Sequence, residues 1–114
     1  MREGAAATTR YGSVIRLRAG QEARYRELHA AVWREVLETI RRCNIRNYTI
    51  FYRGGWLFSY FEYVGADYAA DMARMAADPA TQRWWDVCMP LQEPLEDRAE
   101  GEWWAAMDEV FHQD

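Results

Sequence analysis

The sequence predicts an α+β fold of the ferredoxin-like sandwich type, in which helices cover one face of an antiparallel sheet. Three observations support this class. The 114 residues suit one domain with one core. Segments with a period of two alternate with segments of helical period. A glycine pair between two aromatic segments is typical of a hairpin turn. The expected order is β-α-β-β-α-α-β.

The first half of the predicted domain begins with a strand at residues 10–18, which Gly20 ends. A strongly periodic stretch follows and predicts one amphipathic helix of about twenty residues. Residues 1–9 are expected to form a flexible polar extension, so the single domain is expected to span 10–114. The apolar stripe of the helix comprises Tyr25, Leu28, His29, Val32, Trp33, Val36, Leu37 and Ile40.

Two strands, 47–53 and 55–64, are predicted to form a hairpin around Gly54 and Gly55. Aromatic and β-branched side chains occur at both alternations of these strands, so both sheet faces are apolar. An antiparallel sheet with one solvated face normally alternates apolar with polar residues. Helices are expected on one face only, and a second copy of the chain is the simplest cover for the other. The sequence therefore predicts a homodimer.

The second half is predicted to contain two helices, a loop and a last strand. Residues 66–78 have helical composition. Asp78 offers an N-cap for the next helix, because Pro79 suits its first turn, and that helix should end near Pro90. Residues 90–103 read as a polar loop, and 103–111 as the closing strand.

Composition excludes several classes of function. The formal net charge of −4 argues against nucleic-acid binding, and no apolar run approaches the ~20 residues that span a membrane. All fourteen basic residues are arginine, which excludes Schiff-base chemistry on lysine and a phosphate loop ending in Gly-Lys. Cys43 and Cys88 stand apart and are expected to be buried free thiols, and no histidine spacing suggests a metal site. We expect a cytoplasmic protein without metal or cofactor.

His29 is the candidate catalytic residue, because it lies within the apolar stripe and Tyr25 precedes it by one helical turn. A buried, hydrogen-bonded core histidine is one interpretation. A general acid/base at a pocket wall is the other, and Tyr48 would meet it from the sheet. Trp84 and Trp85 likewise either fill the core or offer a platform for a sugar ring.

Several ordered segments resemble the L-rhamnose mutarotase family: "YRELHAAVW" (25–33), "NYTIFY" (47–52), "QRWW" (82–85) and "MDEVF" (107–111). The resemblance implies a dimeric α+β barrel that interconverts the α and β anomers of a sugar without cofactor or metal. It implies that His29 is the catalytic proton donor and that Tyr25, Tyr48, Trp84 and Trp85 hold a monosaccharide. The chain departs from the family at Ala30, Ala31 and Arg34, where the family often has Asn-Pro-x-Trp-Pro around the tryptophan, and in its acidic loop with Trp103 and Trp104.

Two other functions stay open on these residues. Cofactor-free monooxygenases and cyclases of aromatic natural products share a similar dimeric barrel, and a pocket rich in Trp and Tyr with one His also suits a polyketide ring. A non-catalytic sugar-binding module is the third option, since fold alone does not separate these classes.

Overall fold

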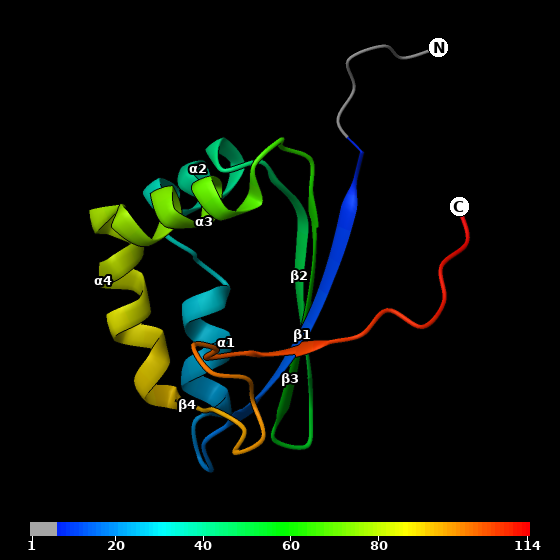
Figure 1. The fold of residues 1–114 in the computed structure, drawn as a ribbon. Coiled ribbons are helices and arrows are strands. Elements are labelled where there is room, and N and C mark those ends of the chain that lie inside the picture. Colours follow the sequence, from blue (N-terminus) through cyan, green and yellow to red (C-terminus); the bar gives the residue numbers. More distant parts are fainter. Residues whose placement is uncertain (1–6) are drawn as a thin grey trace.

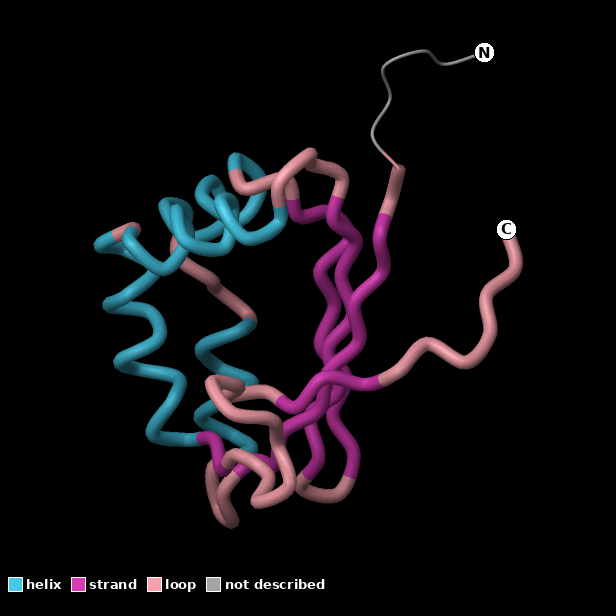
Figure 2. The backbone as a smooth tube through the Cα atoms, in the orientation of Figure 1, coloured by secondary structure: helices cyan, strands magenta, loops and turns pink. Residues whose placement is uncertain are grey.

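The computed structural model describes residues 7–114, which form two layers: four α-helices lie together on one side and the sheet on the other (Figures 1 and 2). The predicted extension, 1–9, falls largely outside the described residues, and the first strand already includes Thr9. The predicted α+β sandwich with helices on one face is confirmed. In order, the elements are β1 (Thr9–Leu17), α1 (Glu22–His29), α2 (Arg34–Arg42), β2 (Ile45–Arg53), β3 (Trp56–Tyr63), α3 (Tyr68–Ala77), α4 (Pro79–Cys88), a 3-10 turn (Met89–Leu91), β4 (Gln92–Glu93) and β5 (Ala105–Met107).

The sheet is antiparallel, with strand order β2-β3-β1-β4 and with β5 also paired to β1. Strand β1 is therefore central: β3 pairs with it on one side, and the short β4 and β5 pair with it on the other. Ile15 and Leu57 pair across β1 and β3 and are almost completely buried under the helices. Alternate residues point to opposite sides of a strand, so Trp56 and Phe58 face away from the helices.

The single long helix predicted over the apolar stripe is wrong. Helix α1 ends at His29, the chain turns through 30–33, and α2 begins at Arg34. Trp33 has an extended backbone (ψ 137°) and places its ring edge-on to Trp84, with 5.2 Å between ring centroids. Most of the stripe still faces the interior on both sides of the break, with Tyr25 and Val36 buried, although Leu37 is 52% exposed. Periodicity reports which residues face the core rather than whether one helix carries them.

A β-bulge in β2 decides which side chains face the helices. Arg46 pairs with Glu62 and Thr49 with Tyr60, so β2 has one more residue than β3 in this interval. The extra residue reverses the alternation, and both Ile45 and Ile50 therefore face inward. Asn47 makes the bulge with a positive φ of 53°, which asparagine tolerates better than most residues. Its side-chain amide donates to the Glu62 carboxylate at 2.8 Å. Tyr48, the next residue, reaches the space between sheet and helices.

The end of the chain agrees with the prediction for its helices but not for its last strand. Asp78 caps α4 as expected, since its carboxylate accepts from the Thr81 backbone N–H at 3.0 Å. Strand β5, however, covers only Ala105–Met107 instead of 103–111, and β4 lies inside the predicted loop. The segment after β5 runs away from the body of the domain (Figure 1), and Val110 and Phe111 are 95% and 78% exposed. With so little to pack against, it forms no further ladder.

Candidate active site

A cavity of about 320 Å³ lies between the helices and the inner face of the sheet, at the end of α1. We call it the His29 cavity. His29 and Tyr48 are its polar groups, and the remaining walls are apolar side chains from α2, β2 and α4 and the segment before α2. Its lining residues are His29, Val32, Val36, Leu37, Ile40, Tyr48, Ile50 and Trp84.

His29 is held by two contacts with Tyr25, one helical turn earlier. Its Nδ1 lies 2.9 Å from the Tyr25 backbone oxygen, and the two rings stack with centroids 4.1 Å apart and planes at 21°. A carbonyl oxygen only accepts hydrogen bonds, so Nδ1 carries the proton and Nε2 of the neutral ring is the free base. The edge of Trp84 closes on the same imidazole, at 5.2 Å between centroids. The imidazole is therefore fixed in position and in tautomer.

The Tyr25 hydroxyl is buried and belongs to a chain of hydrogen bonds that reaches the C-terminal loop. The Trp103 indole N–H donates to Gln92 Oε1 at 2.8 Å, and Gln92 Nε2 donates to the Tyr25 oxygen at 3.0 Å. Because the indole only donates, it fixes which end of the buried amide faces Tyr25. Trp103 thereby supports the ring on which His29 rests.

Burial sets the protonation states around the cleft. It lowers the pKa of His29 from the ordinary value of 6.5, and the hydrogen bond to the Tyr25 carbonyl only partly opposes this. Burial raises the pKa of Tyr25, which the Gln92 amide partly offsets, and that of the Cys88 thiol to about 11. Tyr48 is 45% exposed over its whole surface, but its hydroxyl end lies in the cleft, where desolvation raises its pKa to about 12. Near neutral pH, His29 is thus the group lining this cavity that exchanges a proton readily.

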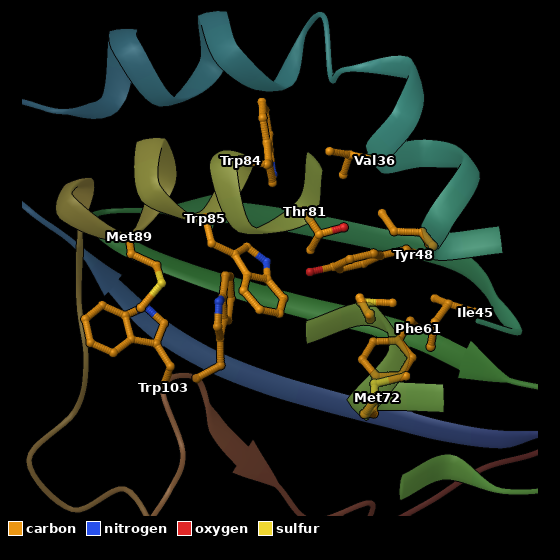
Figure 3. A pocket seen from close by; sticks show the side chains of 13 residues that line it. Val36, Ile45, Tyr48, Phe61, Met72, Thr81, Trp84, Trp85, Met89 and Trp103 are labelled. Carbon is orange, nitrogen blue, oxygen red and sulfur yellow. The ribbon is translucent and has the colours of Figure 1, made fainter. Parts of the chain in front are cut away.

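A second cavity of about 310 Å³ adjoins the first, and we call it the tryptophan cavity. It shares Val36, Ile40, Tyr48 and Trp84 with the His29 cavity, so the two lie side by side, and we refer to them together as the cleft. Figure 3 shows Trp84, Trp85 and Trp103 around this space, with the Tyr48 hydroxyl pointing into it. Besides those shared residues, its lining residues are Ile45, Phe61, Met72, Met75, Thr81, Trp85, Met89, Trp103 and Trp104.

The adjacent tryptophans thus share a cavity although their burial differs. Trp84 is 7% exposed and packs in the core between Trp33 and His29, whereas Trp85 is 37% exposed. Neighbours on a helix point about 100° apart, and both rings nevertheless line the tryptophan cavity. Trp84 is a wall of both cavities, and Trp85 borders only the tryptophan cavity.

Four of the five predicted site residues line the cleft: His29, Tyr48, Trp84 and Trp85. Tyr25 borders a more open hollow that His29 also lines, and it contacts the cleft through the His29 ring. Sequence reasoning missed Gln92, Trp103 and Trp104, which it left in a polar loop. The one available signal was the second pair of tryptophans, since such residues are seldom left in a solvated loop.

The described residues hold no group of three or more His, Cys, Asp or Glu side chains arranged as metal ligands. Cys43 and Cys88 are both buried and free, as expected from their isolation in the sequence. Within residues 7–114, no helix has the length and apolar character needed to cross a bilayer.

Comparison with known proteins gives a consistent result. The family model described as L-rhamnose mutarotase matches residues 10–113. An L-rhamnose mutarotase from Opitutus terrae is 32% identical over 105 residues, which cover 89% of this chain and 94% of that relative. An L-fucose mutarotase from Xanthomonas campestris is 34% identical over 93 residues, covering 78% of this chain and 74% of the relative.

Solved structures show the same architecture. The crystal structure of an L-rhamnose mutarotase from Formosa agariphila superposes with a TM-score of 0.72 at 22% identity, covering 93% of this chain and 99% of that one. A NIPSNAP family protein from Agrobacterium tumefaciens superposes with a TM-score of 0.59 at 16% identity, covering 82% and 83%. At these identities the two superpositions describe the fold and carry no information on substrate.

Proposed function

Because this chain belongs to the L-rhamnose mutarotase family, we propose that it interconverts the α and β anomers of L-rhamnose or a related aldose, with His29 moving the proton. The chain is a sugar mutarotase, an isomerase, as its relatives indicate. The relatives give no support to the monooxygenase, the cyclase or the non-catalytic sugar-binding module. Because L-rhamnose and L-fucose mutarotases are both among the relatives, the identity of the sugar is the finer part of the proposal.

The chemistry needs one proton removed and one delivered. In ring opening, the anomeric hydroxyl loses its proton, the bond between C1 and the ring oxygen breaks, and the ring oxygen gains a proton. Rotation about the C1–C2 bond and closure by the reverse steps give the other anomer. His29 Nε2 is unprotonated in the tautomer described above, so it accepts the first proton and, as imidazolium, becomes the donor. Over a full cycle, His29 and the sugar both return to their initial protonation states.

The remaining predicted residues are assigned to binding and support. Tyr48 stays protonated at neutral pH, so its hydroxyl is suited to donate a hydrogen bond to the sugar or to deliver the second proton. Trp84 and Trp85 offer indole faces for the apolar side of the ring. Tyr25 holds the imidazole from behind through its carbonyl and its ring.

One observation carries this assignment: His29 and Tyr48 are the titratable side chains among the residues that line the His29 cavity. No carboxylate takes part in that lining, so proton transfer at this place falls to these two groups. An imidazole can accept and donate a proton near neutral pH. That suits a reaction that already proceeds in water and needs only moderate acceleration, typically ~10²–10⁴-fold from general acid/base catalysis.

Anomer exchange measured by NMR tests the proposal. The test uses saturation transfer between the α and β anomeric protons of L-rhamnose, L-fucose, D-glucose and L-mannose. The exchange rate should rise with enzyme concentration, and it should rise most for the 6-deoxy sugars L-rhamnose and L-fucose. No acceleration for any aldose, with a correctly folded protein, would overturn the assignment. Oxygen consumption with an anthrone-type substrate tests the oxygenase alternative in the same samples.

We also propose that two copies associate through the outer face of the sheet. Phe51 and Phe58 pair there across β2 and β3, and Phe51 is 63% exposed. The helices all lie on the opposite side (Figure 2). An exposed apolar patch of this kind normally marks an interface. Sedimentation should give a dimer for the parent and a monomer for Phe51→Asp. A folded monomeric parent at micromolar concentration would contradict the proposal.

The proposed location is the cytoplasm. Two buried thiols that remain unpaired are typical of proteins from reducing compartments, and a free aldose from metabolism is available there. Fractionation of cells that express the tagged chain tests this.

A further inference from the structure

Trp104 lines the tryptophan cavity but takes no part in the proton transfer assigned to His29. It lies with Trp103 at the end of loop 94–104, which begins after β4 and leads into β5, and both of these strands pair with β1. Arg98 closes the loop on itself, because its guanidinium donates to two backbone oxygens of the loop at 2.8 and 2.9 Å. The loop is therefore held at both ends and delivers its indoles to a defined place.

The cleft runs across the sheet from β2 towards β5. Tyr48 and Ile50 of β2 line the His29 cavity, whereas Trp104 directly precedes β5 and lines only the tryptophan cavity. Strands β2 and β5 lie on opposite sides of the β3–β1 pair. Figure 3 likewise shows Trp103 at the side of this space remote from Tyr48. The loop tryptophans therefore form the end of the cleft opposite the imidazole.

A sugar ring held as proposed extends into both cavities. The bond that breaks, between C1 and the ring oxygen, must lie at His29. In a six-membered ring, the C3–C4 bond is opposite that bond. Trp85, which is assigned to holding the ring, borders only the tryptophan cavity. The C3–C4 edge of the sugar, with its hydroxyl groups, is therefore directed towards the loop tryptophans.

Trp104 offers this edge a hydrogen-bond donor. The N–H of its neighbour Trp103 is already engaged, since it donates to Gln92 at 2.8 Å. Within residues 7–114, the Trp104 N–H has no such partner, yet every buried side-chain nitrogen or oxygen atom there is paired. The Trp104 N–H is therefore accessible rather than enclosed in the core. An indole only donates, so it suits a hydroxyl oxygen.

The position of this donor bears on which sugar is preferred. L-Rhamnose and L-fucose, the two candidate 6-deoxy sugars, differ in configuration at C2 and C4. C2 is bonded to the reacting carbon and lies near His29, whereas C4 lies on the remote edge. Resting on the proposed function, we infer that Trp104 is a specificity-determining residue: its N–H donates to the C4 hydroxyl and so discriminates between sugars that differ in configuration there.

Removing each partner of this contact in turn tests the inference. Calorimetry compares the tighter-binding of L-rhamnose and L-fucose with its 4-deoxy counterpart, in the parent and in Trp104→Phe. In the parent, the 4-deoxy sugar should bind about two- to tenfold more weakly, the worth of one hydrogen bond. Trp104→Phe keeps an aromatic ring without the N–H, so the two sugars should bind within about twofold of each other. No penalty in the parent, or an equal penalty in both proteins, would overturn the inference.

The parent protein alone provides a second measurement. With the tryptophans labelled with nitrogen-15, one indole N–H signal should shift when the sugar is added and stay in place with the 4-deoxy counterpart. That signal should be missing from the spectrum of Trp104→Phe. Identical shifts of all indole signals with both sugars would contradict the contact.

Trp103→Phe and Trp85→Phe are matched controls, since each also removes an indole N–H from the lining of the tryptophan cavity. Trp103→Phe leaves Gln92 without its donor, so it should slow anomer exchange of L-rhamnose and L-fucose by a similar factor and keep the 4-deoxy penalty. Trp85→Phe should keep the penalty too. Only Trp104→Phe should change the ratio of the two exchange rates. A penalty lost in a control but kept in Trp104→Phe would assign the contact to another ring and refute the inference.

The two proposals fail differently, because binding and anomer exchange are measured separately. A 4-deoxy penalty that depends on Trp104, without exchange of any anomer, contradicts the mutarotase mechanism and supports the contact. Anomer exchange without such a penalty supports the mechanism and overturns the contact.

Discussion

The two halves of the cleft share a wall but have opposite chemistry. In the His29 cavity, an imidazole is fixed by a carbonyl at 2.9 Å and by a stacked tyrosine. In the tryptophan cavity, indoles and thioethers surround a space with few free polar groups. Polar groups in a protein must be paired to be buried at low cost, whereas apolar walls need no orientation. His29 and its support are therefore assigned to proton transfer and the tryptophan walls mainly to holding the ring, so variants of the two sets should affect different measurements.

The largest expected effect is on the reaction. His29→Ala should slow anomer exchange by ~10²–10⁴-fold, because the group that exchanges protons near neutrality is removed. Sugar binding should persist weakly through the tryptophans. His112→Ala, at an exposed site in the C-terminal segment, is the control and should exchange at the parent rate. Exchange by folded His29→Ala at the parent rate would make the imidazole a core residue and refute its catalytic role.

The adjacent tryptophans should separate stability from binding. Trp84→Ala removes a ring packed on His29 and Trp33, so unfolding free energy should fall by about 3–5 kcal/mol. Trp85→Ala, at a position 37% exposed, should cost much less stability and should mainly weaken ligand binding. Urea unfolding beside calorimetric titration measures both. Equal losses of stability would show that the two rings are equivalent core residues.

A smaller effect is expected at the support of His29. Gln92→Leu leaves the buried Tyr25 hydroxyl and the Trp103 N–H without partners, which should lower unfolding free energy by about 1–3 kcal/mol. Exchange should slow without a change in the pH at which it is half-maximal, because the imidazole itself is untouched. Gln82→Leu, on the exposed side of α4, should stay within about 0.5 kcal/mol of the parent. Unchanged stability in Gln92→Leu would show that the hydrogen bonds from Trp103 through Gln92 to Tyr25 do not stabilise the fold.

The smallest effect concerns pH. Burial lowers the pKa of His29 in the folded state below 6.5, so below that pH the unfolded chain binds more protons than the folded one. Stability should therefore fall as pH drops through 6.5, and His29→Gln should flatten this dependence. Exchange should also persist to lower pH than an exposed imidazole allows. Thermal melting and exchange rates between about pH 5 and 8 measure both. A melting temperature that rises as the pH is lowered through this range would contradict the expected loss of stability.

Much of the fold was predictable because local patterns report burial. Partial alternation placed β1, aromatic and β-branched composition around a glycine pair placed β2 and β3, and Asp78 with Pro79 placed the start of α4. The break at 30–33 was not predictable from periodicity, since the apolar stripe runs through it. Residues 30–34 contain neither proline nor glycine, so the turn forms without a residue that would mark it in the sequence.

The site was predictable in its chemistry and less so in its shape. A histidine within an apolar stripe, with a tyrosine one turn earlier, indicated a buried imidazole. The inward position of Tyr48 depends on a bulge, and a bulge depends on one positive φ at Asn47 that alternation does not reveal. The loop tryptophans needed tertiary contacts: Gln92 is 67 positions from Tyr25, and only the folded chain brings the two side chains together.

The pairing of the central strand β1 has a consequence for how the chain folds during its synthesis. Strand β1 is made before every other described element, yet two of its neighbours, β4 and β5, are made after the four helices. Contacts so distant in sequence form slowly, and a growing chain folds from its N-terminal end. The Tyr25 hydroxyl therefore gains its partners Gln92 and Trp103 only after the four helices have been made. A chain truncated before Gln92 would carry His29 but lack the support behind it, so catalytic competence should arise only after this later segment has been made and has folded.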